Sequence, residues 1–163
     1  MGMTRGRVLL AVLIASVGSL AGWQASAENN RVTFPKNLDQ LVHYTTVKRG
    51  NSTERMLISQ FAIEAAKNGR ELPAGTQVVL ADFRDGQVFR YFVMEKGQGW
   101  GADYAPGRRT GDWQFQSFKP DRTVNLSENT ARCQSCHQGQ KETQFLYTFN
   151  DLRRFNGTPG GAE

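Results

Sequence analysis

The chain of 163 residues carries 20 basic and 15 acidic residues, a formal net charge of +5. Its lysines and arginines gather only in isolated pairs, without the interleaved aromatics of a basic stripe, so the charge pattern excludes a predicted nucleic-acid surface. Both cysteines lie three positions apart in one motif, which leaves no thiol to form a disulfide elsewhere.

The N-terminal segment has the pattern of a secretory signal peptide. Arg5 and Arg7 precede an apolar run over residues 8–17, and an Ala-Ser-Ala triplet ends at Ala27. The apolar run is short for a hydrocarbon layer of roughly 30 Å, although an uncleaved anchor is the alternative. We therefore expect a signal peptide over 1–27, export to the periplasm, and a single domain over 28–163.

The first elements of that domain are a strand and a helix. A helical turn running into a strand is predicted within Leu38–Val47, an apolar stretch. Ser59 precedes a run of good helix formers over residues 60–68, and Gly69 follows it. These are the signals of an N-cap, a helix and a left-handed C-terminal stop.

The middle of the chain predicts an antiparallel hairpin and a third strand. Residues 76–83 and 88–94 are β-branched and aromatic in type, and residues 84–87 carry a tight-turn signal between them. Residues 96–111 are rich in glycine, which predicts a long functional loop beside the site. Alternation over residues 113–118 predicts a half-buried strand.

The C-terminal part is predicted to carry the chemistry. Ser127 is expected to cap a helix over residues 128–137, which Gly139 ends. Aromatic residues in the segment 145–155 are expected either to wall the site or to close the core. Residues 157–163 are expected to be disordered.

The motif Cys133-Gln-Ser-Cys136-His137 has the C-x-x-C-H pattern of covalent haem attachment. A helical offset of three brings both thiols over the same porphyrin edge, where they add to the two vinyl groups, and the adjoining imidazole reaches the iron. A redox dithiol or half a zinc site is the alternative, but a zinc site needs further ligands, and His43 is the only other histidine. We predict one covalently bound haem c with His137 as axial ligand.

The sixth iron position decides between electron transfer and ligand binding. Candidate ligands in the domain are His43, Met56 and Met94. Each lies in an apolar or strand-like stretch, where packing is the commoner role of these residues. An open distal site is therefore favoured over a six-coordinate electron carrier, which stays an alternative.

The strand-rich middle argues against a small all-helical cytochrome c and against the four-helix cytochromes. The chain instead resembles the cytochrome P-460 family, which includes the cytochromes c prime beta. The strings that carry the resemblance are Ala74-Gly75-Thr76, Gly111-Asp112-Trp113-Gln114-Phe115, Ala131-Arg132-Cys133-Gln134-Ser135-Cys136-His137 and Tyr147-Thr148-Phe149.

This resemblance implies an α+β fold, mainly an antiparallel β-sheet with a few helices, with haem attached on a C-terminal helix. It also implies a homodimer and a five-coordinate haem with His137 as proximal ligand. In the family's enzymes a lysine is cross-linked to the haem edge and hydroxylamine is oxidised, whereas the binding members lack the bond and take nitric oxide at an apolar distal face.

The family's lysine lies a few residues beyond a Gly-Thr step, which places Leu80 at that position in this sequence. A count from Gly86 gives Tyr91 instead, and the nearest lysine is Lys96. Leu80 cannot cross-link, so the resemblance favours a distal Leu80 and a binding protein over an enzyme.

Three phenylalanines, Phe83, Phe89 and Phe92, are candidates for an apolar distal cap, and Arg55 lies near the place of the family's polar distal residue. The leading hypothesis is a periplasmic mono-haem cytochrome that binds nitric oxide or a similar small ligand and changes redox state with a partner protein. A hydroxylamine-oxidising enzyme and a six-coordinate electron carrier are the alternatives.

Overall fold

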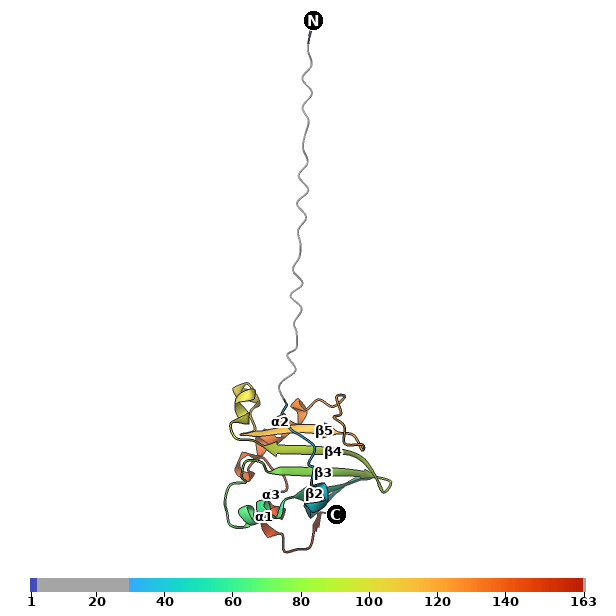
Figure 1. Ribbon diagram of the computed structural model, residues 1–163, viewed down its shortest axis with the longest axis vertical. Coiled ribbons are helices and arrows are strands. Elements are labelled where there is room, and N and C mark those ends of the chain that lie inside the picture. Colours follow the sequence, from blue (N-terminus) through green and yellow to red (C-terminus); the bar gives the residue numbers. More distant parts are fainter. Residues whose placement is uncertain (3–29, 163) are drawn as a thin grey trace.

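The computed structural model describes residues 1–2 and 30–162, so almost all of the predicted signal peptide lies outside the described residues. In the part described, no helix is long and apolar enough to cross a membrane. A sheet of six strands in the order β5-β4-β3-β2-β1-β6 forms the centre of the fold (Figure 1). Strands β1 to β5 pair with one another in antiparallel fashion and β6 runs parallel to β1, so the fold is α+β as predicted.

The strands are β1 (Val42–Arg49), β2 (Ser52–Ile58), β3 (Gln77–Arg84), β4 (Gln87–Lys96), β5 (Trp113–Phe118) and β6 (Gly160–Ala162). The helices are α1 (Gln60–Lys67), α2 (Ala131–His137) and α3 (Phe149–Arg154). Short 3-10 helices are η1 (Leu38–Gln40), η2 (Trp100–Asp103), η3 (Pro106–Arg108) and η4 (Gln138–Thr143).

Local sequence signals explain the hairpin β3–β4 and the helix α1. Asp85 and Gly86 have φ values of 49° and 77°, the double left-handed turn that joins twisted antiparallel strands. The Ser59 side chain accepts a hydrogen bond of 3.2 Å from the Ala62 amide, and Gly69 has a φ of 67°. Both predictions are confirmed.

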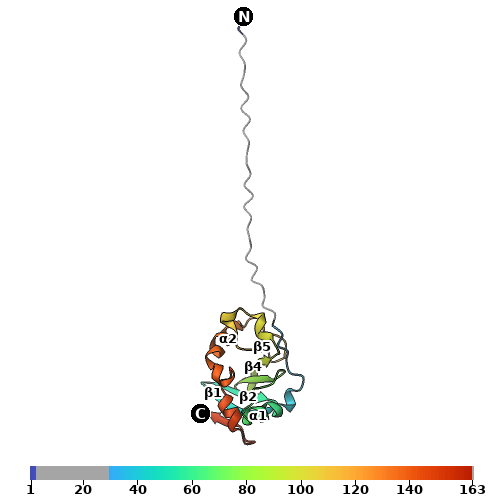
Figure 2. The same cartoon turned by 90° about the vertical axis from the view of Figure 1, so that its left-hand side faces the viewer.

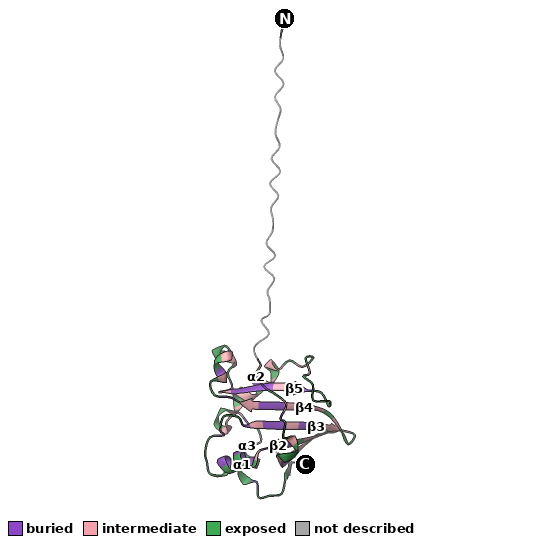
Figure 3. Ribbon diagram, viewed as in Figure 1, coloured by how far each residue is buried: buried purple, intermediate pink, exposed green. Residues whose placement is uncertain are grey.

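The sheet lies between two layers of chain. Figure 2 shows the C-terminal segment with α2 and α3 on one face of the sheet and the N-terminal lead-in on the other. We call the face toward the C-terminal segment the inner face and the other the outer face. Buried residues concentrate in the middle of β3, β4 and β5 (Figure 3). The outer face packs Val79, Ala81, Tyr91 and Val93 with the lead-in residue Val32 into one apolar cluster.

Strand β5 and the chain end differ from the predictions. The strand is buried on both faces, because the fully buried Gln114 side chain accepts a hydrogen bond from the Arg31 amide (2.8 Å) and donates one to Asp103 (2.7 Å). A polar residue so satisfied is compatible with burial. Residues 160–162 form β6 where disorder was predicted, because the edge of β1 offers them backbone partners.

The helix with the cysteine motif is shorter than predicted. Helix α2 begins at Ala131, because the Ser127 hydroxyl donates to the Asn125 side chain (2.7 Å) in a turn and caps nothing. It does not end at Gly139, since the chain continues from His137 directly into η4. The motif itself is helical, as predicted.

Candidate functional site

A cavity of about 550 Å³ lies between the inner face of the sheet and the C-terminal segment. Cys133, Cys136 and His137 line it from α2, and Leu80 lines it from β3. The four residues predicted to form the site therefore come together around one cavity. The loop 96–111, predicted to lie beside the site, contributes no lining residue.

The His137 ring is held in one orientation. Its Nδ1 atom lies 2.5 Å from the Phe145 carbonyl oxygen, and because a carbonyl only accepts, Nδ1 carries the proton. The second nitrogen, Nε2, is then left with its lone pair, as an axial ligand requires. The rings of Phe115 (4.8 Å between centroids) and Tyr147 (5.2 Å) hold the imidazole between them. Burial lowers the pKa of His137, which favours the neutral imidazole.

The carbonyl that orients His137 depends on unusual backbone. Gln144 and Phe145 both have left-handed φ values, 52° and 64°, which turn the chain sharply after η4. The Phe145 ring packs against Gly111, where a Cβ atom would lie 2.8 Å from the ring. Gly111 also has a φ of 58°, so this position requires glycine on both counts. Gly111 belongs to one of the strings that carry the family resemblance.

The loop 96–111 braces helix α2 from outside the cavity. Arg108 donates a hydrogen bond of 2.7 Å to the side chain of Gln134, which is buried in the middle of the cysteine motif. Gln138 donates one of 2.7 Å to the Gly107 carbonyl. The loop therefore fixes the helix that presents the thiols, which differs from the direct role that the sequence predicted.

The two cysteines are free thiols in different environments. Cys133 is partly buried, and burial, followed by the nearby Glu128 carboxylate, raises the pKa of its thiol. Cys136 is exposed, and its carbonyl accepts a hydrogen bond of 2.9 Å from the Tyr147 hydroxyl. Among the described residues, no group of three or more His, Cys, Asp or Glu side chains is placed to hold a metal ion.

The wall opposite α2 is a row of apolar side chains across three strands. Met56, Leu80 and Phe92 are cross-strand neighbours on β2, β3 and β4, and directly paired residues share one face of a sheet. All three line the cavity. Val78 and Met94 form the adjacent apolar row, so both candidate methionines face the cavity.

The other end of the inner face is polar, and sequence reasoning missed it. Arg90 contacts the buried Asp82 carboxylate (3.1 Å) and forms an ion pair with Glu128, just before α2. Arg49 and Glu54 form a second pair beside it. The alternation from Leu80 to Asp82 along β3, with Arg90 opposite, is the signal that places this polar end on the cavity side.

Two predicted distal candidates lie on the outer face. His43 pairs across the sheet with Leu57, which packs into the outer cluster, and its Nε2 atom bonds the Thr46 hydroxyl (2.8 Å). Arg55 stacks over the Phe83 ring at 4.6 Å, away from the cavity. Odd and even residues of a strand alternate between faces, so Glu54, not Arg55, faces the cavity.

Of the three candidate cap residues, only Phe92 lines the cavity. Phe83 packs on the outer face, and Phe89 is exposed beneath the Arg84 guanidinium, 3.7 Å from it. A bulge between Asp82 and Phe83 shifts the register there, which simple alternation does not reveal.

The family model described as Cytochrome P460 matches residues 34–148, more than half of the chain and all four predicted site residues. The chain belongs to the cytochrome P460 family. This family is one of haem-binding c-type cytochromes, and haem is its cofactor. No curated protein matches the chain.

The residues around the cavity fit the cofactor of the P460 family. The cavity has the size and the largely apolar lining typical of a cofactor site. It combines two free thiols at an offset of three with an imidazole whose Nε2 lone pair is free. Cys133, Cys136 and His137 are therefore the residues that would hold haem, and Leu80 belongs to the wall opposite them.

Proposed function

We propose that this member of the P460 family is a periplasmic mono-haem c-type cytochrome. Cys133 and Cys136 attach one haem c covalently, and His137 is its axial ligand. The Phe145 carbonyl keeps the imidazole in the tautomer that presents Nε2. The proposal extends to export by the signal peptide over 1–27 and to a protein redox partner, and it includes the homodimer that the family resemblance implies.

The bound haem supplies an iron that exchanges one electron and takes a small ligand at an open position. The observation that carries ligand binding is the apolar row Met56, Leu80 and Phe92 opposite the imidazole. These side chains exclude water and offer no hydrogen bond to an anion, so they favour a small neutral molecule such as nitric oxide. Leu80 leaves the iron side open where a lysine would reach the porphyrin.

Absorption spectra of the purified ferric and ferrous holoprotein test this function. We expect a high-spin haem with an ordinary Soret band and uptake of nitric oxide by the ferrous form. A ferrous protein that fails to take up nitric oxide would contradict the proposal. Replacing Leu80 with alanine enlarges the distal space, so L80A is expected to bind nitric oxide faster than the wild type.

A six-coordinate electron carrier is the second candidate, because Met56 and Met94 both line the cavity. A thioether on the iron gives low-spin spectra. M56A and M94A then distinguish the candidates: a low-spin wild type that becomes high-spin in one variant identifies that methionine as ligand. His43 is a poor candidate on the outer face.

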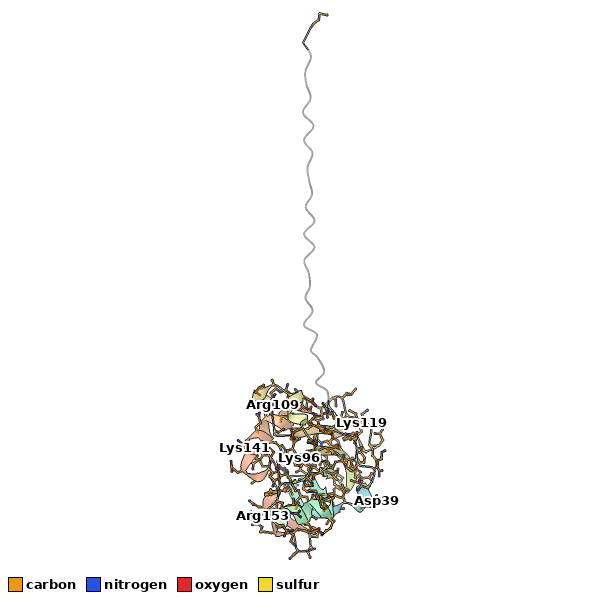
Figure 4. The ribbon with its side chains drawn as sticks, turned by 60° about the vertical axis from the view of Figure 1, so that its left-hand side comes forward. Asp39, Lys96, Arg109, Lys119, Lys141 and Arg153 are labelled. Carbon is orange, nitrogen blue, oxygen red and sulfur yellow. The ribbon has the colours of Figure 1, made fainter. Side chains whose placement is uncertain are left out.

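Hydroxylamine oxidation through a cross-linked lysine gains no support from the lysine positions. No lysine of the described chain lines the cavity, and Lys119 and Lys141, for example, lie on opposite sides of the molecule (Figure 4). The Lys96 ammonium pairs with Glu71 (2.5 Å) and donates to the Leu72 carbonyl (2.8 Å). Peptide mapping that finds a haem bond besides the two thioethers would restore this candidate.

A further inference from the structure

The polar end of the cavity holds a carboxylate that is incompletely partnered. The Glu54 side chain is only 16% exposed, and its Oε2 atom lies 3.3 Å from the Arg49 Nε atom. That oxygen is closed off from solvent and accepts no hydrogen bond of good geometry among the described residues. Buried polar atoms are nearly always hydrogen-bonded, so the position points to a partner from the cavity.

The charges around Glu54 come from every element packed against it. Arg49 faces it from β1, Asp82 from β3 and Arg90 from β4, while Glu128 lines the same cavity from the segment before α2. Burial is the largest influence and raises the pKa of Glu54, Asp82 raises it further, and the two arginines lower it. Glu54 is therefore a carboxyl group that takes up a proton more readily than an exposed glutamate.

The order of the strands in the sheet sets the distance between Glu54 and the cysteines. Helix α2 packs on β5, whereas Glu54 lies on β2, with β4 and β3 between them. Neighbouring strands are about 4.8 Å apart, so β5 and β2 are separated by roughly 14 Å. The two thiols would hold the vinyl edge of a haem near α2. Because the propionates leave the opposite edge of a porphyrin, they would then face the strands far from β5.

Among the three arginines of the cavity, only Arg49 is suited to an additional anion. Arg90 is already engaged by the carboxylates of Asp82 and Glu128. Arg132 lies next to Cys133 on α2, at the side of the cavity where the thioethers would form. The Arg49 side chain is 69% exposed and has one carboxylate partner, so donors of its guanidinium remain for a second.

We propose that Arg49 and Glu54 form the binding site of a haem propionate, with Arg49 as the cation and Glu54 sharing a proton with the propionate. This inference rests on the proposed haem function. Two carboxyl groups this close cannot both be ionised at little cost, so the pair holds one proton. A propionate oxygen then supplies the hydrogen-bond partner that Glu54 lacks in the protein.

The pair couples haem reduction to proton uptake. An external one-electron donor supplies the electron, and the solvent supplies the proton that binds between Glu54 and the propionate. The oxidised haem carries one more positive charge, which lowers the proton affinity of the pair relative to the reduced form. The reduction potential therefore falls as pH rises between the pKa of the pair in the oxidised protein and its pKa in the reduced protein.

Spectroelectrochemistry of the holoprotein between pH 5 and about 9 tests the site. The wild type is expected to show a slope approaching one proton per electron over part of this range, and E54Q a much flatter line. R49Q removes a cation beside the haem, so its potential is lower at every pH and its sloping region moves to higher pH. R55Q is the matched control, because Arg55 is the next residue on β2 but faces outward.

Infrared difference spectra of the reduced and oxidised wild type give an independent readout. A carboxylic-acid band that changes with redox state and is lost in E54Q supports the site, even where one variant folds poorly. Equal pH profiles of wild type and E54Q in haem-loaded protein, or an E54Q effect on nitric oxide binding alone, would overturn the propionate site. A wild type that carries no haem by mass and absorption would instead overturn the proposed function itself.

Discussion

The two faces of the central sheet are formed by the same strands but have different surroundings. On the outer face, Phe34 of the lead-in makes edge contacts with Tyr91 (5.1 Å between ring centroids) and Phe118 (5.3 Å), which closes an ordinary core. On the inner face, Leu80 and its neighbours border a cavity. Val79 and Leu80 are adjacent in sequence, yet one is fully buried in the core and the other faces the site.

Along the middle of β3 and β4, strand alternation separates residues of the outer core from residues that line the cavity. Tyr91 and Phe118 pack against protein in the outer cluster, so the loss of either is expected mainly to lower the free energy of unfolding. Leu80 and Phe92 line the cavity in which a cofactor is proposed to lie, so the loss of either is expected to change the spectra and ligand binding. Matched substitutions on the two faces can therefore break or sharpen the comparison.

The two histidines give the largest expected contrast. H137A removes the imidazole that faces the cavity and is expected to abolish the histidine-ligated haem spectrum. H43A removes an imidazole on the outer face and is expected to leave the spectrum unchanged. Absorption spectra of both purified variants, with haem content measured by intact mass, check this. A loss of spectral features in H43A would show that the assignment of faces is wrong.

Two phenylalanines on neighbouring strands give the next contrast. Phe118 is buried on the outer face, so F118A is expected to lower the free energy of unfolding by roughly 3–5 kcal/mol. Phe92 borders the cavity beneath the Arg90 guanidinium, so F92A is expected to cost less stability and to speed nitric oxide uptake. Urea unfolding and stopped-flow binding measure the two effects. Equal stability losses would contradict the distinction.

The residues that were predictable from sequence share a local signal. Ser59 and Gly69 bracket α1, the Asp85-Gly86 turn joins β3 to β4, and C-x-x-C-H stands by itself. The wrong or missing predictions concern residues whose burial depends on partners that are distant in sequence. Gln114 is polar by type but buried because distant partners satisfy its amide. Strand β2 went unpredicted since its polar residues are sheltered only by pairing with β1 and β3.

The candidate site divides in the same way. Cys133, Cys136 and His137 follow from their spacing, and Leu80 follows from the family resemblance. The polar end with Glu54 and Arg90 does not, because it depends on the register of three strands and on a bulge. Side chains two residues apart on a strand share a face of the sheet, so Glu54 faces the same way as Met56. This alternation predicts that Glu54 rather than Arg55 faces the cavity only when the face of Met56 is already known.

Two glycines with left-handed backbone test whether the packing of Phe145 on Gly111 helps to orient His137. G86A, in an open hairpin turn, is expected to cost about 1–2 kcal/mol of backbone strain. G111A adds a clash with the Phe145 ring, so it is expected to cost more and to disturb the His137 spectrum through the Phe145 carbonyl. Unfolding and absorption measurements of both variants decide. A G111A spectrum identical to that of G86A would show that the packing of Phe145 on Gly111 does not control the orientation of His137.

The pH dependence of stability gives the smallest expected effect, on the outer face. Burial, followed in the same direction by the charge of Arg55, lowers the pKa of His43 in the folded protein, against a hydrogen bond to Thr45 that raises it. As the pH falls through about 6.5, His43 binds a proton in the unfolded chain but remains neutral in the folded protein. The free energy of unfolding therefore decreases as the pH falls below that value. Wild type is expected to lose more stability than H43Q between pH 8 and about 5, measured by urea unfolding. Other titrating groups are common to both proteins, so equal losses would mean that His43 is as easily protonated in the fold as in the unfolded chain.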